Sequence, residues 1–257
     1  MKKAIKRALV IAMCFFSVMF AMSSTTLAAS KTSGKCGKKI KWSYNTKTKT
    51  LTISGKGKME DYYRSRPRPW DDYKDDIKKI IIKKGITSTG GNSFYICERL
   101  EKISIAKSVK EIDEASFQRC NNLREVKIPK GVKTIRACAF SDNDNLRKVV
   151  ISGSVKKIEA YAFGECPELS KVTLSNGIKE IGDEAFNACP NLKTVSIPNS
   201  VKKIGNVAFG YETIEYDLSS GKYVGKDKIE GFTIYGKKGS AAEKYAKKNG
   251  FTFKESK

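Results

Sequence analysis

The apolar positions between residues 94 and 209 recur at a constant step of 23 residues. Phe marks the step most clearly, and Leu, Ile or Val recur 6, 9, 11, 15 and 18 residues after the first five Phe. A strict period of roughly 20–50 residues predicts a stacked solenoid, because one unit cannot cover its own apolar side. The Phe column consists of Phe94, Phe117, Phe140, Phe163, Phe186 and Phe209.

Each repeat predicts the same series of short elements. Two apolar residues separated by one outward residue, as in Val126-Lys127-Ile128, predict a short strand of period two. A reversal rich in Pro, Gly, Asn and Ser follows, then a second short strand. The stretch that leads into each Phe contains Ala or Ser, and we expect a helical turn there. Residues 71–93 form a degenerate first repeat, in which Thr89 replaces the last Ile.

The segment before the repeats predicts an N-terminal cap. Residues 40–44 and 51–53 alternate apolar and polar side chains around a turn-like segment at 45–49, which predicts a β-hairpin. An extended basic linker covers 64–70, and we expect Trp70 to pack against the first repeat. A solenoid needs such a cap, because an open end leaves an apolar face and an unpaired strand edge in water.

The segment after the repeats predicts a second cap. The period fails after residue 209, and residues 211–230 are mostly polar. Ser240 and Glu243 form a capping box, which predicts a helix over residues 240–249. We expect further short strands on the two sides of this helix, at 232–235 and 251–253.

The repeats also resemble a known family. Phe at 23-residue steps, followed by Cys-x-x-Leu-x-x-Val-x-Ile-Pro and Val-x-x-Ile, is similar to the BspA-like leucine-rich repeats of bacterial surface proteins; residues 120–129 and 189–198 carry the match most fully. The resemblance covers roughly residues 36–257 and implies a curved β-solenoid used for adhesion to host or matrix proteins. Asn143 departs from the pattern, since it stands where the column expects Cys, and this leaves the packing of that repeat open.

Together these patterns predict a β-rich leucine-rich repeat solenoid with an N-terminal β-hairpin cap and a C-terminal α/β cap. The expected parts are a signal peptide at 1–28, the N-terminal cap and linker at 31–70, the solenoid at 71–210 and the C-terminal cap at 211–257.

The first residues predict export. Basic residues precede an apolar run at 8–22 and a small-residue stretch at 23–29, as in a secretory signal peptide. Cys14 lies inside the apolar run, an unfavourable position for lipid attachment. Cleavage after Ala28 would remove four basic and no acidic residues, so that the formal charge falls from +23 to +19. An exported protein with this excess of Lys is expected to associate with anionic material.

The cysteines leave two states open. Four of them stand three residues after a repeat Phe, in a fixed column that favours small buried thiols. Export permits disulfides, and coils about 4.8 Å apart lie within the bridging range, so this alternative remains beside the favoured reduced state. Cys36 and Cys138 lie outside the column, which comprises Cys97, Cys120, Cys166 and Cys189.

The residue types argue against most catalytic chemistry. The chain contains no His, which removes Ser-His-Asp and Cys-His arrangements and His-based zinc motifs. No phosphate-binding Gly loop or dinucleotide fingerprint occurs either. We therefore expect no enzyme activity, no cofactor and no metal; a hydrolase with two carboxylates is a remote alternative.

Two sets of Lys residues are the candidate sites. The first lies on the outward positions of the first strand of each repeat and forms a candidate ligand-binding face: Lys79, Lys102, Lys127, Lys148 and Lys171. The second occupies one position of the second strand region in every regular repeat: Lys110, Lys133, Lys156, Lys179 and Lys202. This second column is either a solvated Lys copied with its repeat or a charge track for an anionic polymer, whose binding would fall steeply with salt.

We therefore expect a secreted or cell-surface, adhesin-like binding module that recognises an extracellular protein or an acidic glycan through its strand face. The alternative is a basic structural protein held on anionic cell-wall polymers. We expect a monomer with no membrane span after signal removal. We expect no specific nucleic-acid partner, because the strand face has few aromatic residues for stacking bases.

Overall fold

The computed structural model describes residues 31–63, 65–212, 214–217, 222–225 and 227–256. The chain divides into two units, residues 1–31 and Thr32–Lys257. The predicted signal peptide lies outside the described residues. The description that follows concerns the second unit, and the residue boundaries expected for its parts stay a prediction.

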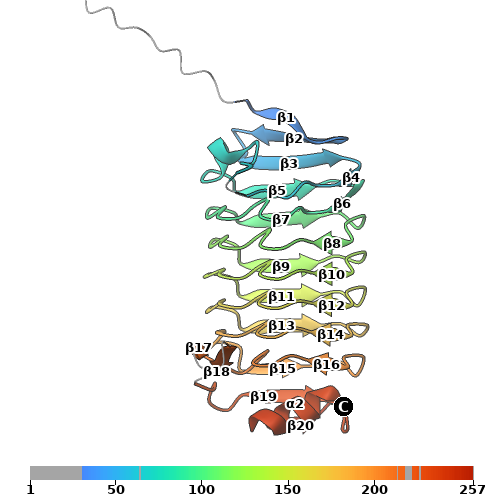
Figure 1. The fold of residues 1–257 in the computed structure, drawn as a ribbon, viewed down its shortest axis with the longest axis vertical. Helices are drawn as coiled ribbons and strands as arrows, with labels where there is room; N and C mark the ends of the chain where they lie inside the picture. The colour runs from blue at the N-terminus through green and yellow to red at the C-terminus, as the bar shows by residue number, and fades with distance from the viewer. Residues whose placement is uncertain (1–30, 64, 213, 218–221, 226, 257) are drawn as a thin grey trace, which may run out of the picture. The chain divides into compact units, whose positions relative to one another are not determined.

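The first strand of each repeat lies in a parallel ladder along one side of the stacked coils (Figure 1). The register follows the 23-residue step, as in Val126↔Val149 and Ile128↔Ile151. The ladder is divided after β7 and after β13, since these strands and the next ones belong to different hydrogen-bonded sheets. Its strands are β5 (Lys79–Ile82), β7 (Lys102–Ile105), β9 (Glu125–Ile128), β11 (Lys148–Ile151), β13 (Lys171–Leu174) and β15 (Thr194–Ser196).

The second strands form a seven-stranded ladder on another side of the coils. It begins at Gly57, directly after the N-terminal hairpin. Its strands are β4 (Gly57–Lys58), β6 (Ile86–Ser88), β8 (Glu111–Ile112), β10 (Thr134–Ile135), β12 (Lys157–Ile158), β14 (Glu180–Ile181) and β16 (Lys203–Ile204).

The predicted apolar columns form the core between the ladders. All six residues of the Phe column are at most 1% exposed. Their rings stack in series with centroids 4.8–5.2 Å apart, within the range of favourable offset stacking. The half-buried column residues Ile103, Ile105 and Val172 lie in the strands where the first ladder is divided. The solenoid predicted from the period is confirmed.

The segment around each Phe is not the helical turn that we expected. The residues two before and two after each of the first five Phe have left-handed backbones, as at Ala115 (φ 49°) and Arg119 (φ 58°) around Phe117. Their amides and that of Phe117 donate to carbonyls of the next coil, at 2.9–3.1 Å. The same pattern recurs along the Phe column, so these N–H groups point toward the C-terminal end and the accepting carbonyls toward the N-terminal end.

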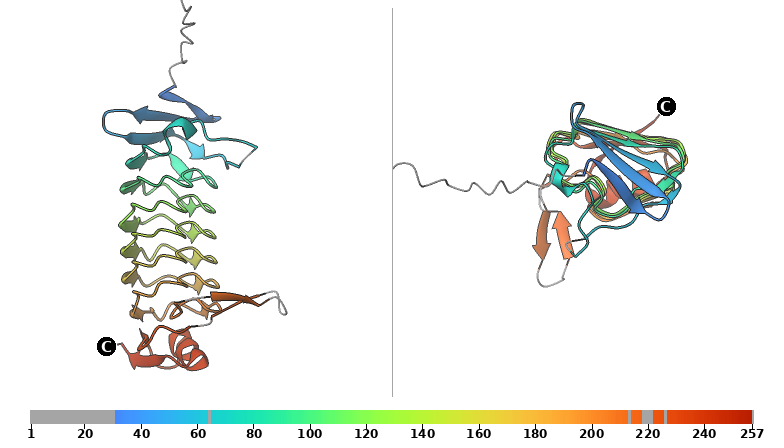
Figure 2. Two further views of the ribbon diagram at one scale, coloured as in Figure 1. Left: turned by 90° about the vertical axis from the view of Figure 1, so that its left-hand side faces the viewer. Right: turned by 90° about the horizontal axis from the view of Figure 1, so that it is seen from above.

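The N-terminal hairpin is confirmed, with one strand more than predicted. β2 (Ile40–Asn45) and β3 (Thr50–Gly55) pair antiparallel, and β1 (Ser33–Gly37) adds to the outer edge of β2. β3 pairs parallel with β5, so that the hairpin extends the first ladder (Figure 2). The 3-10 helix η1 (Asp71–Tyr73) follows the linker.

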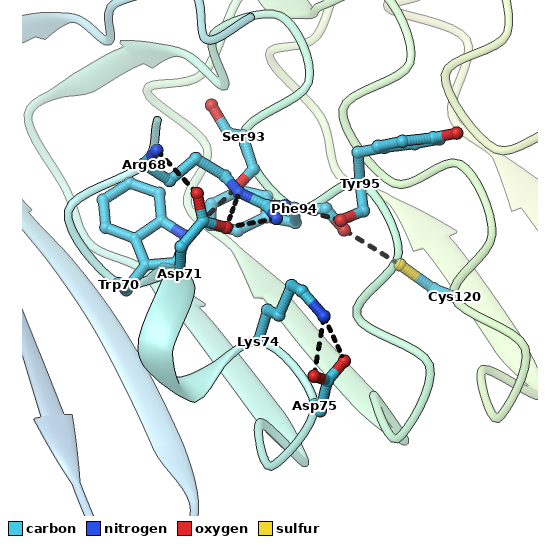
Figure 3. Close-up of polar contacts among 9 residues, drawn as sticks. All are labelled: Arg68, Trp70, Asp71, Lys74, Asp75, Ser93, Phe94, Tyr95 and Cys120. Atoms are coloured by element: carbon cyan, nitrogen blue, oxygen red, sulfur yellow. Dashed lines mark hydrogen bonds and ion pairs between the residues drawn. The ribbon is translucent and has the colours of Figure 1, made fainter. Parts of the chain in front are cut away.

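Three donors close the N-terminal end of the Phe column, where carbonyls would otherwise lack partners, and Figure 3 shows two of them, Trp70 and Arg68. The indole Nε1 of Trp70 donates to Ser93 O at 3.1 Å, and its ring stacks on Phe94 with centroids 5.8 Å apart. The Arg68 guanidinium donates to Tyr95 O at 2.5 Å and pairs with Asp71. The amide of Tyr62 donates to Gly91 O at 2.9 Å. Trp70 thus packs on the first coil as predicted.

Asn143 fits the Cys column because its amide makes more hydrogen bonds than a thiol. Cys120 and Cys166 each donate a thiol hydrogen bond to a Phe carbonyl of the preceding coil. Asn143 is fully buried and donates to the equivalent Phe117 O at 3.1 Å, while its Oδ1 accepts from Cys120 N at 3.0 Å. A buried amide with both ends satisfied carries little penalty.

The C-terminal cap continues the first ladder. β19 (Thr233–Gly236) pairs parallel with β15, and β20 (Thr252–Glu255) pairs with β19. Helix α2 (Ala241–Asn249) lies between them in sequence. β17 (Ile214–Asp217) and β18 (Lys222–Gly225) form a hairpin before β19, which projects from the side of the stack (Figure 2).

The predicted capping box of α2 is only partly correct. Ser240 occupies the N-cap position, but its side chain makes no capping hydrogen bond. Glu243 Oε2 instead accepts from the amide of Gly239 at 2.6 Å. Gly250 ends the helix in a left-handed conformation, as expected for a C-terminal stop.

The corner between the two ladders alternates Gly and Ser from coil to coil. Gly131 has a φ of 126°, and a Cβ there would lie 2.1 Å from Lys107 O. Ser154, one coil later, accepts the Gly131 amide on its Oγ at 3.0 Å. The same Gly–Ser bond recurs, so this corner repeats every two coils: Gly85, Ser108, Gly131, Ser154, Gly177 and Ser200.

Candidate functional site

The candidate Lys residues of the first ladder lie on its outer face. Strand alternation turns the apolar pair of each strand inward and leaves the flanking residues outside. Lys79 is in register with Lys102, and Lys148 with Lys171. Lys127 stands two residues further along its strand, opposite Val150. The structure thus gathers the five residues on one face, in two columns.

A hollow of about 790 Å³ opens on this face between β7 and β9, where the ladder is divided. Four cationic residues line it together with the half-buried side chain of Ile103. We name it the β7–β9 hollow. Its cationic lining is Lys79, Lys102, Arg124 and Lys127.

The carboxylates of the β7–β9 hollow are already paired. Glu125 Oε1 lies 2.9 Å from Lys148 Nζ and 3.4 Å from Lys127 Nζ. The hydrogen bond from Lys148 lowers the pKa of the Glu125 carboxyl. Glu101 lies 3.1 Å from Lys78. Since Lys148 and Lys78 stand outside the lining, their charges offset the two carboxylates, and the hollow keeps a net positive charge.

Arg124 is the cationic residue of this hollow that the sequence interpretation missed. It stands one residue before β9, outside the outward strand positions from which the Lys face was predicted. Arg147 occupies the equivalent position in the next coil. A basic residue repeated at this offset was the signal available.

The second Lys set forms one continuous column, which we call the Lys ladder. After Lys110, each backbone amide of the column donates to the carbonyl of the Lys one coil before, from Lys133 N to Lys110 O at 2.7 Å through Lys202 N to Lys179 O at 2.8 Å. All five residues are exposed. Within the described part of the chain, none of them forms an ion pair with a carboxylate. Lys156 and Lys202 contact only carbonyl oxygens, of Gly177 and Asn199.

The cysteines of the column are structural in this fold. Cys97, Cys120, Cys166 and Cys189 are fully buried free thiols. Burial raises the pKa of Cys97 and of Cys189 to about 12. A thiol that stays protonated is a poor nucleophile. Cys120 donates to the carbonyl of Phe94, as Figure 3 shows.

Neither a metal-binding cluster nor a membrane-spanning helix occurs in the described residues. No cluster of three or more His, Cys, Asp or Glu there could hold a metal ion. No helix in the same residues is long and apolar enough to cross a membrane.

Comparison with protein families identifies the repeat. Six copies of the BspA type leucine rich repeat region match residues 87–215. This chain belongs to the BspA-type leucine-rich repeat family. No curated protein matches this BspA-type chain.

Seven solved structures match this BspA-type protein. A T. pallidum leucine rich repeat protein is 23% identical, with a TM-score of 0.47, and the match covers 67% of this chain and 81% of that one. A leucine-rich repeat protein from Eubacterium ventriosum is 21% identical, with a TM-score of 0.40 and coverage of 67% and 68%. A leucine rich cell surface protein from Faecalibacterium prausnitzii is 19% identical, with a TM-score of 0.32 and coverage of 70% and 74%.

Proposed function

We propose that this BspA-type protein is an exported, adhesin-like binding module that recognises an acidic protein or an acidic glycan through its strand face. The observation that carries the proposal is the β7–β9 hollow, where Lys79, Lys102, Arg124 and Lys127 converge. Repeat solenoids typically serve as binding surfaces, because each coil adds side chains to one extended face. Membership of the family supports the same class of function.

The lining of the hollow favours an anionic ligand group. Arg124 offers a planar fork of donors that matches a carboxylate or sulfate, while the Lys residues act as mobile point charges around it. Ile103 provides an apolar contact between them. Clustered charge of one sign also raises the rate of encounter with acidic partners.

Export is the second part of the proposal. It rests on the basic residues, apolar run and small-residue stretch of positions 1–29. Attachment at the cell surface is supported by the excess of positive charge, since cell-wall polymers are commonly anionic. Mass spectrometry of the mature N-terminus in the culture medium and in the wall fraction tests this part. An intact residue 1 in both fractions would contradict it.

Charge reversal on the face tests binding. The variant Lys102→Glu/Lys127→Glu should lose at least about tenfold in affinity for any acidic matrix protein or sulfated glycan that binds the wild type, about 1.4 kcal/mol. The matched control is Lys237→Glu/Lys238→Glu, two exposed residues that follow β19 near the other end of the stack. Equal affinity in the face variant, or an equal loss in the control, would show that the face is not the site.

A second candidate function is favoured by the Lys ladder. Five exposed cations without carboxylate partners suit a basic structural protein held on an anionic cell-wall polymer. Salt washing of intact cells should then release the protein, because counterion binding competes with the contacts. Full retention at molar salt would rule out this electrostatic attachment. No observation favours the hydrolase alternative, and we expect no turnover of glycan or peptide substrates.

A further inference from the structure

The C-terminal end of the Lys ladder opens into a second hollow, of about 240 Å³, between β16 and α2. The α2 residues that line it follow the spacing i, i+3, i+4, i+7 and i+8, which places them on one face of the helix. We name it the α2 hollow. Its lining is Lys202, Lys203, Ile204, Gly205, Asn206, Ala241, Lys244, Tyr245, Lys248 and Asn249.

The walls of the α2 hollow are held in place by buried contacts. The Tyr245 hydroxyl accepts from Phe209 N and donates to Phe209 O, each at 2.9 Å. Asn249 donates to Tyr245 O at 2.8 Å and accepts from the Tyr211 hydroxyl at 3.0 Å. The helix is therefore fixed against the last coil, and its Lys residues project from a rigid support.

The charge of the α2 hollow is unbalanced. Four of its lining residues are Lys, and none is Asp or Glu. Lys248 contacts the neutral Asn206 Oδ1 at 3.2 Å. The acidic side chain of the same helix is engaged elsewhere, since Glu243 pairs with Lys247 at 2.8 Å and accepts from Gly239 N.

The acidic residues on the adjoining coil do not enter the lining. Glu180 is in backbone register with Lys203 on the neighbouring strand, and Asp183 Oδ1 accepts from Asn206 N at 2.7 Å. Neither side chain lines the α2 hollow. Its four cations therefore share a small space with no carboxylate in the lining, a geometry that favours a multiply charged anion.

We propose that the α2 hollow binds the terminal phosphate groups of a linear phosphate polymer, whose following units lie along the Lys ladder. Lys202 belongs to both sites and joins them. The hollow presents four Lys ammonium groups, point charges of the kind that bind phosphate in proteins, and a terminal phosphate carries more negative charge than a single carboxylate. The polymer part extends the second candidate function, whereas the hollow itself stands on its own geometry.

Calorimetry with two probes separates the parts of the proposal. Tripolyphosphate is too short to follow the ladder, and the background variant Lys102→Glu/Lys127→Glu removes the competing β7–β9 hollow, so that in this background tripolyphosphate should bind in the α2 hollow. The variant Lys244→Gln/Lys248→Gln should weaken its binding at least about tenfold. The ladder variant Lys133→Gln/Lys156→Gln should leave tripolyphosphate binding unchanged. Both variants should weaken long-chain polyphosphate and lower the slope of log affinity against log salt by about one for each Lys removed.

The matched control is Lys237→Gln/Lys247→Gln, which removes the same two charges from positions outside the lining. Equal loss in this control, or unchanged tripolyphosphate binding in Lys244→Gln/Lys248→Gln, would overturn the proposal. Thermal unfolding checks that helix α2 remains folded in these variants. If α2 unfolds, Lys203→Gln in β16 removes a Lys of the hollow without changing the helix.

Two further results, with long-chain polyphosphate and with single-stranded DNA, also test the proposal. If the ladder variant leaves the affinity for long-chain polyphosphate intact while the hollow variant reduces it, the hollow is supported and the ladder function fails. Tighter binding of single-stranded DNA with an equal number of phosphates would overturn the assignment to a phosphate polymer without bases.

Discussion

The two ends of the Phe column are closed by different chemistry, although the column between them is uniform. At the N-terminal end the groups that meet the first coil are donors: the Tyr62 amide, the Trp70 indole and the Arg68 guanidinium. At the C-terminal end the Tyr245 hydroxyl accepts the Phe209 amide. The difference follows from the direction of the backbone.

Around each Phe the N–H groups point toward the C-terminal end of the stack, and the accepting carbonyls point toward the N-terminal end. Aligned peptide units leave partial negative charge where carbonyls are exposed and partial positive charge where amides are exposed. The first coil therefore needs donors, and a cation is favourable there. The last coil needs an acceptor. The polarity of this side of the solenoid decides which residue types can cap it.

The largest loss of stability is expected when the aromatic cap, Trp70, is removed. Trp70→Ala should lower the free energy of unfolding by about 3–5 kcal/mol, because it deletes a fully buried ring that stacks on Phe94. Trp70→Phe keeps a ring but leaves Ser93 O without its donor, at a cost of about 1–3 kcal/mol. Urea unfolding measures both. If Trp70→Phe were as stable as the wild type, the carbonyl would not need a donor.

The next test removes the cationic donor. Arg68→Met should cost about 1.5–3 kcal/mol, because Tyr95 O loses a charged partner and Asp71 loses its ion pair. The side chain of Arg68 is only 9% exposed, so solvent cannot replace these contacts easily. Arg66→Met is the control, because that exposed residue pairs with Glu60 at the surface. Its replacement should lower the free energy of unfolding by less than about 1 kcal/mol. Equal effects would contradict the capping role.

A smaller effect is expected at the other end. Tyr245→Phe keeps the ring against Phe209 but leaves the amide and the carbonyl of Phe209 without this partner, so the loss should be about 1–2 kcal/mol. Hydrogen exchange of the Phe209 amide should become faster, because that amide loses its acceptor. Unchanged protection would show that the C-terminal end needs no acceptor.

The smallest effect on stability is expected at Glu165, beside the middle of the Phe column, and it depends on pH. Partial desolvation, followed by the neighbouring Asp142 carboxyl, raises the pKa of Glu165 from 4.5 to about 7. Between these values the folded state binds more protons than the unfolded state, so stability should fall as the pH rises from about 4.5 to 7. Glu165 is exposed, which limits the effect to below about 1 kcal/mol. Glu165→Gln should flatten this slope in thermal unfolding, and an unchanged slope would exclude Glu165 as its source.

The sequence was sufficient to predict what repeats. The Phe column, the strand pairs and the two Lys sets share one period, and a period places residues of one column on one side of the stack. The same argument could not predict the left-handed residues beside each Phe. These positions hold residues as different as Cys138 and Tyr161, so composition gives no signal there.

Features that occur once were also missed. Arg68 caps the Phe column from a linker, and its role depends on a carbonyl that no pattern marks. The α2 hollow depends on where a helix packs against the last coil, and the β7–β9 hollow depends on a division of the ladder between otherwise similar strands. Such features arise from tertiary packing, which periodicity does not describe.

The alternation of Gly and Ser at the corner of the coils sets a rule for changing the length of this protein. Removing a single coil would bring two Gly or two Ser into neighbouring positions, so that one Gly amide loses its acceptor or a side chain meets a carbonyl where only hydrogen fits. Removing or adding coils two at a time keeps every Gly opposite a Ser. Shortened or lengthened versions should therefore fold well in steps of 46 residues and poorly in steps of 23.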